Sequence, residues 1–299
     1  MTSPLEEIHI KNDANIQLYI KREDLLHPHI SGNKYRKLKY NLQEAKQKGK
    51  DTLLTFGGAF SNHIAASAYA GKLNGLRTIG VIRGEELKSK ISTNPTLSFA
   101  QECGMIFYFM SREAYRKKED PDILNQLYEK YGDFYLIPEG GTNTLAVKGC
   151  EDILDDSTKK FNYICTSVGT GGTISGIINA SETHQKILGF PALKGAFLSK
   201  EITKFATKTN WQLIPGYNFG GYAKINTELI TFINDFKSMY NISLDPIYTG
   251  KMMFGILDMI ALNQFEENSK ILAIHTGGLQ GILGMNQRLK AKSMPQIKV

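Results

Sequence analysis

Short apolar runs that end in small or glycine-rich turns recur along this chain, and a helix-like stretch follows most of them. The runs read as strands over Thr52–Phe56, Thr78–Ile82, Met105–Phe109, Phe134–Ile137, Tyr163–Val168, Ile187–Phe190 and Ile271–His275. The helix-like stretches are Ala65–Leu73, Thr96–Glu102, Leu145–Leu154, Thr173–His184 and Met252–Asn263. This alternation is typical of α/β proteins with open, twisted parallel sheets, and we predict that fold class.

The predicted strands divide near residue 140, with four before it and three after it. The 299 residues are enough for two domains at roughly 150 residues each. We therefore expect one sheet in about residues 40 to 140 and a second sheet beyond it.

Composition excludes several classes of protein. The net charge is +7, but apart from one segment the basic residues are dispersed, which argues against nucleic acid as a partner. The three cysteines lie far apart, so neither a disulfide framework nor a cysteine metal site is expected. We find no apolar run near the ~20 residues of a membrane span and no secretory leader, and we expect a cytoplasmic protein.

Polar loops that end strands or open helices are the candidate sites, because open α/β sheets bind ligands at the carboxyl ends of their strands. The first, Ser31–Lys39, is a turn followed by a basic helical start. It reads either as a solvated charged face or as a loop that presents Lys34, whose amine can form a Schiff base if its pKa is lowered.

Two further loops place hydroxyl and amide side chains beside paired glycines. Thr55–His63 carries Ser61, Asn62 and His63 after Gly57 and Gly58, which an N-cap explains only in part. The nucleophile elbow of a Ser/His hydrolase is absent there. Ile137–Asn143 is explained by helix capping alone.

The strongest local signal is Ser167–Gly176, a glycine and threonine loop between a strand and a helix. Free backbone N–H groups at a helix start, approached closely because glycine lacks a side chain, can hold a phosphate. A dinucleotide fingerprint fails because Ile174 stands where glycine is needed, and a P-loop lysine is missing. A plain tight turn is the alternative.

The C-terminal part holds two more segments, Asp245–Lys251 and Ala273–Gly278, in which a hydroxyl residue stands beside glycine. Tyr248 and His275 lie in them. Either residue can instead be a satisfied part of the core.

Together, a reactive amine, a phosphate loop without a nucleotide signature and polar strand ends match the needs of pyridoxal phosphate. SGNKYRKL, GGAFSNH, GTGGT, DPIYTGK and HTGG, in this order over residues 15 to 285, resemble the 1-aminocyclopropane-1-carboxylate deaminase and D-cysteine desulfhydrase family. That family has the fold of the tryptophan synthase β subunit. The resemblance implies a large domain of residues 1–40 and 141–299, a small domain of residues 41–140, and a homodimer.

The resemblance also implies roles for individual residues. Lys34 would be the Schiff-base lysine, Asn62 would contact the cofactor ring, and Ser61, Tyr248 and Tyr222 would face the substrate. The phosphate would be held by Gly169, Thr170, Gly171, Gly172 and Thr173.

Substrate choice in the family depends on two positions near the pyridine nitrogen, which are Thr249 and Thr276 here. Deaminases resemble this chain but carry Glu and Leu at these positions, whereas desulfhydrases carry hydroxyl residues. A carboxylate deepens the electron sink that opening a cyclopropane ring demands, and a hydroxyl suffices for losing an α proton and sulfide. Phe60 and Tyr35 depart from the family pattern and can reshape the pocket.

The sequence therefore predicts β-elimination of a D-amino acid, with D-cysteine giving pyruvate, ammonia and sulfide. One alternative is a 1-aminocyclopropane-1-carboxylate deaminase on the same cofactor. The other is a non-catalytic protein that binds a small anion.

Overall fold

The computed structural model describes residues 1–195 and 197–299. Its strands are β1 (Leu5–Ile8), β2 (Gln17–Lys21), β3 (Thr52–Gly57), β4 (Arg77–Arg83), β5 (Ile106–Met110), β6 (Tyr135–Ile137), β7 (Tyr163–Val168), β8 (Lys186–Pro191), β9 (Trp211–Leu213) and β10 (Lys270–Ile274). The α-helices are α1 (Asn33–Gln47), α2 (Asn62–Asn74), α3 (Pro95–Glu102), α4 (Arg112–Arg116), α5 (Pro121–Tyr131), α6 (Thr144–Glu151), α7 (Gly172–Ala180), α8 (Phe197–Thr203), α9 (Thr227–Tyr240), α10 (Thr249–Ala261) and α11 (Gly281–Lys290).

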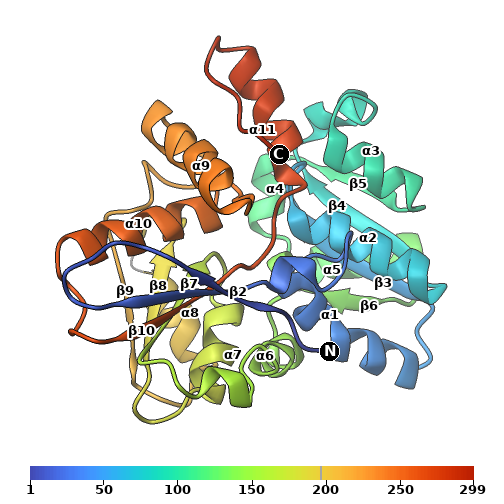
Figure 1. Ribbon diagram of the computed structural model, residues 1–299. Coiled ribbons are helices and arrows are strands. Elements are labelled where there is room, and N and C mark those ends of the chain that lie inside the picture. The colour runs from blue at the N-terminus through green and yellow to red at the C-terminus, as the bar shows by residue number, and fades with distance from the viewer. Residues whose placement is uncertain (196) are drawn as a thin grey trace.

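The strands form two sheets with helices packed around them (Figure 1). One sheet has the order β1-β2-β10-β7-β8-β9 and the other has the order β5-β4-β3-β6. Every strand pair is parallel except β1 with β2. The α/β class with open parallel sheets is confirmed.

All seven predicted strands are present, with ends that differ by a residue or so. The short strands β1, β2 and β9 were not predicted; β1 is an edge strand whose middle residues are both glutamates, so it has no apolar run. The predicted helix Thr173–His184 is wrong at its end, because α7 stops at Ala180. There Ser181 turns extended and its hydroxyl donates to the Ile178 carbonyl, which directs the chain into β8.

Helix α1 lies between the two sheets and packs against α6 and α2. Strands β3 to β6 all fall within residues 52–137, and the other sheet takes strands from both ends of the chain. Because α1 runs unbroken from Asn33 to Gln47, it continues across residue 40. The domain boundaries at residues 40 and 140 stay a prediction.

Among the described residues, no helix is both long enough and apolar enough to cross a membrane.

A close backbone contact joins the start of α1 to the end of β10. The Asn33 N–H donates to the Thr276 carbonyl at 3.2 Å. A Cβ on Gly32 would lie 2.0 Å from that same carbonyl oxygen, and Gly32 has a φ of +60°. Only glycine fits there, since the φ disfavours other residues and the space is absent.

We predict that Gly32→Ala destabilises the protein by several kcal/mol more than Gly49→Ala, as measured by urea unfolding. Gly49 is the matched control, because its φ is +65° but no atom lies within 4 Å of the added Cβ. Equal losses in the two variants would show that the contact with Thr276 does not constrain the fold.

Candidate active site

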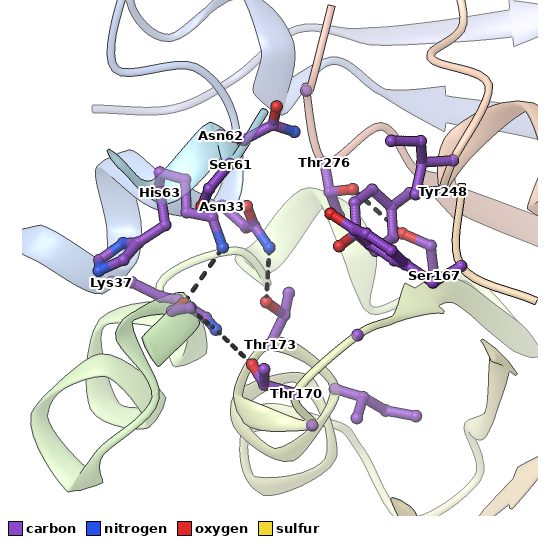
Figure 2. A pocket seen from close by; sticks show the side chains of 18 of the residues that line it. Asn33, Lys37, Ser61, Asn62, His63, Ser167, Thr170, Thr173, Tyr248 and Thr276 are labelled. Carbon is purple, nitrogen blue, oxygen red and sulfur yellow. Dashed lines mark hydrogen bonds between the residues drawn. The ribbon is translucent and has the colours of Figure 1, made fainter. Parts of the chain in front are cut away.

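A cavity lies where the carboxyl ends of β3, β6, β7 and β10 meet the starts of α1, α2 and α7 (Figure 2). All six polar segments of the sequence contribute to it, although they are far apart along the chain. Its lining residues include Asn33, Lys34, Lys37, Phe60, Ser61, Asn62, His63, Gly140, Ser167, Gly169, Thr170, Gly171, Thr173, Tyr222, Tyr248 and Thr276.

Two lysine side chains from α1 reach one carbonyl oxygen in this cavity. Lys34 Nζ donates to the Gly140 oxygen at 3.2 Å, and Lys37 Nζ donates to it at 3.1 Å. Burial lowers the pKa of Lys34 well below its usual value, and the neighbouring charge of Lys37 lowers it further. Lys34 is therefore an enclosed amine that loses its proton more readily than a lysine at the surface.

The start of α7 combines free backbone N–H groups, two glycines and one nearby cation. Gly171 precedes the helix with a φ of +87°, and no side chain caps the free N–H groups there. A Cβ on Gly172 would lie 2.8 Å from Thr142 and 3.2 Å from Lys37 Nζ, so the helix start and the ammonium approach closely. Helix N–H groups beside a cation are the donors that a phosphate requires.

Lys37 is a site residue that the sequence analysis missed. Besides Gly140, its Nζ donates to Thr142 Oγ1 at 2.9 Å and lies 3.5 Å from Thr170 Oγ1. Its position three residues after Lys34 could have indicated this role, because residues three apart on a helix share a face. Asn33 also acts here, since its side chain donates to Thr173 Oγ1 at 2.8 Å (Figure 2).

His63 is a second residue whose position the sequence could not give. Thr55 Oγ1 donates its hydrogen to the Ile137 carbonyl, so it must accept from His63 Nε2 at 2.7 Å. This fixes the Nε2–H tautomer and leaves a lone pair on Nδ1, which is buried without a partner among the described residues. Burial and the nearby charges of Lys34 and Lys37 lower the pKa of His63, so the ring stays neutral.

Ser61 and Asn62 open α2 at the cavity. Ser61 Oγ caps the helix by accepting from the Ile64 N–H at 3.4 Å. Asn62 Oδ1 accepts from Gln280 Nε2, a residue just before α11 that was not predicted. Figure 2 shows both side chains facing the space across from Thr276 and Tyr248.

Tyr222 and Tyr248 stand together on the opposite wall, with ring centroids 6.3 Å apart. Burial raises the pKa of both phenols, so both keep their protons and can donate hydrogen bonds. Lys251 holds the loop that carries Tyr222, because its buried Nζ donates to the carbonyls of Asn218 and Gly221 at 2.8 and 2.9 Å.

The two predicted selectivity residues lie in different surroundings. Thr276 lines the cavity, and its Oγ1 is 3.2 Å from Ser167 Oγ. Thr249 is fully buried and is not among the lining residues, since its hydroxyl donates to Asp245 Oδ2 at 2.7 Å. The structure does not bring Thr249 to the cavity surface, and its contact with a cofactor ring stays a prediction.

His275 is a buried residue whose ring is satisfied outside the cavity. Its Nε2 lies 2.7 Å from the Ser243 carbonyl, and its Nδ1 accepts from the Gly277 N–H at 3.2 Å. The described residues contain no group of three or more His, Cys, Asp or Glu side chains that could hold a metal ion.

Comparison with known proteins places this geometry in a family. The chain is 32% identical to a Thermotoga maritima protein provisionally named a 1-aminocyclopropane-1-carboxylate deaminase, with 91% of this chain and 92% of that protein aligned. It is 30% identical to the Arabidopsis thaliana mitochondrial bifunctional D-cysteine desulfhydrase/1-aminocyclopropane-1-carboxylate deaminase, over 89% of this chain and 73% of that one.

A solved structure agrees in fold as well as in sequence. The crystal structure of an ACC deaminase homologue superimposes with a TM-score of 0.81 at 28% identity, over 97% of this chain and 94% of that one. The model of the family "Pyridoxal-phosphate dependent enzyme" matches residues 2–277. This chain, in which the Lys34 amine and the start of α7 line one cavity, belongs to the family of pyridoxal-phosphate dependent enzymes.

Proposed function

We propose that the protein catalyses elimination from a small D-amino acid, with D-cysteine and water giving pyruvate, ammonia and hydrogen sulfide. The observation that carries this proposal is the Lys34 amine, whose pKa is lowered inside a cavity that ends at Thr276. The name of the Arabidopsis thaliana relative supports the same substrate.

The residues present fit the cofactor. A phosphate would take the free N–H groups at the start of α7, where the missing Cβ of Gly172 leaves room, together with the ammonium of Lys37. Lys34 would engage the aldehyde. Asn62 would contact the ring, and the hydroxyls of Thr276 and Ser167 would face its nitrogen.

When bound, pyridoxal phosphate supplies an aldehyde that reacts with amines and a ring that draws electrons from Cα. The chain's own part is proton transfer and orientation. Lys34, released as a neutral amine, would take the α proton, since its depressed pKa keeps a lone pair available. The N-terminus of α2 with Ser61 would hold the substrate carboxylate, and Tyr248 would donate to it or to the leaving sulfur.

The lining supports elimination over ring opening. No Asp or Glu side chain lines this cavity in the described part of the chain, and hydroxyl groups stand at Ser167 and Thr276. A hydroxyl beside the ring nitrogen makes a weaker electron sink than a carboxylate would. The second candidate remains 1-aminocyclopropane-1-carboxylate deamination, because the relatives carry that name as well.

Membership in a family of enzymes argues against the non-catalytic alternative. The homodimer and the cytoplasmic location suggested by the sequence remain part of this proposal. Gel filtration with light scattering would measure the first.

We predict that D-cysteine changes the visible absorption band of the cofactor-loaded protein while sulfide and pyruvate appear in equal amounts. Lys34→Ala should lower this turnover by at least 10³-fold, since it removes the proposed base. Lys39→Ala, on the exposed side of the same helix and paired with Asp152, is the matched control and should keep activity within twofold. Turnover of 1-aminocyclopropane-1-carboxylate instead of D-cysteine would select the second candidate.

We further predict that Lys37→Met weakens pyridoxal phosphate binding by at least 10-fold but leaves the binding of pyridoxal, which lacks the phosphate, nearly unchanged. The reason is that Lys37 Nζ lies beside the start of α7 and a charge-assisted phosphate contact is among the stronger polar contacts. Absorbance titration of both compounds measures this. A parallel loss for the two compounds would place Lys37 away from the phosphate.

A further inference from the structure

A second and larger cavity of about 560 Å³ adjoins the one described above. The two share Phe60, Ser61, Tyr222 and Tyr248 in their linings, so they are continuous. We call the larger cavity the outer chamber. The residues that line it and do not line the inner cavity include Leu193, Phe197 and Met285.

The walls of the outer chamber expose large apolar side chains. Phe197 is 48% exposed, Tyr222 43% and Phe60 37%. Leu193, Ile247 and Met285 complete an apolar lining, whereas Arg83, Glu139 and Arg288 supply charge. A hollow with an apolar lining and a few charged groups is typical of a small-molecule site, and clustered exposed aromatics indicate one.

Phe60 can pack closely against α11 because that helix lacks a side chain at Gly284. A Cβ on Gly284 would lie 2.6 Å from two atoms of the Phe60 ring. The ring therefore packs directly on the α11 backbone, and it lines both cavities. This aromatic wall favours an apolar group over a polar one next to the reactive site.

The outer chamber, at about 560 Å³, is much larger than a sulfhydryl group. A sulfhydryl group is comparable to a water molecule, which takes roughly 30 Å³ of liquid volume. D-cysteine, the substrate of the proposed function, is too small to fill the outer chamber, so water would occupy the rest of it. If a substrate placed a methylene group against these walls, its affinity would rise roughly fourfold for each such group.

We propose that the outer chamber is a subsite for an apolar alkyl or aryl group carried on the substrate's Cβ through sulfur. This rests on the proposed function and names its substrate class, S-substituted D-cysteines. The Cα–H and Cβ–S bonds break, the Cα proton passes to the Lys34 amine, and the sulfur leaves with the bonding electron pair and takes up a proton. The S-substituted D-cysteine and one water thus give a thiol, pyruvate and ammonia.

The test compares D-cysteine with S-methyl- and S-benzyl-D-cysteine on the cofactor-loaded enzyme, with pyruvate formation as the readout. We expect kcat/KM to rise along this series and to be at least 10-fold higher for the benzyl compound than for D-cysteine. Phe197→Ser should lower the benzyl value at least fivefold and leave the D-cysteine value within twofold. Phe197 lines the outer chamber only, and it is exposed, so the fold should tolerate the change.

Leu262→Ser is the matched control, because Leu262 is 59% exposed and lines neither cavity. It should change neither value. A calorimetric titration of the loaded Lys34→Ala protein gives dissociation constants without turnover, and the benzyl compound should bind at least 10-fold more tightly than D-cysteine.

Two results would overturn the subsite. One is D-cysteine turnover with no advantage for the benzyl compound, and the other is a Phe197→Ser protein that behaves like the Leu262→Ser control. Neither of these results would contradict the proposed function. If no D-cysteine compound is turned over but the benzyl compound still binds more tightly, the proposed function fails and the subsite stands.

Discussion

The Gly140 carbonyl oxygen accepts hydrogen bonds from two lysine amines that α1 carries into the cavity. Two ammonium groups this close repel each other and lose their hydration, so the pKa of each lysine is lowered by burial, and that of Lys34 also by its neighbour. Gly140 has a φ of +68° in the loop after β6, a backbone conformation that favours glycine. The shared oxygen thus ties the two sheets together at the point where chemistry is expected.

The two lysines differ in how many acceptors they have, and this explains a division of roles. An ammonium group has three hydrogens to donate. Lys37 has three acceptors, Gly140, Thr142 and Thr170, which favour its charged form and suit a phosphate partner. Lys34 has one, so it gives up its proton more readily. The neutral ring of His63, with an unused lone pair on Nδ1, adds an acceptor rather than a third cation to the same cavity.

The strand ends could be predicted from sequence because buried parallel strands are short apolar runs that stop at glycine. That rule located the polar loops after β3, β6, β7 and β10, whose carboxyl ends meet at one cavity. Ser31–Lys39 and Asp245–Lys251 follow no predicted strand and were noticed only for their polar side chains beside glycine. The same rule could not predict that Lys37 points into the cavity. Helix α1 buries Arg36, Lys37 and Asn41 and therefore has no plain apolar face. The family resemblance placed Thr249 near the cofactor ring, whereas in the structure its hydroxyl donates a hydrogen bond to Asp245. The tautomer of His63 depends on Thr55 and Ile137, contacts made only by the folded chain.

We propose that Lys34, rather than its neighbour Lys37, is the amine that carries the cofactor. Borohydride reduction of the loaded protein fixes the pyridoxyl group on the lysine that holds it, and mass spectrometry of the peptides identifies that lysine. We expect the pyridoxyl group on Lys34 alone. A label on Lys37, or one spread over exposed lysines such as Lys48 and Lys159, would contradict it.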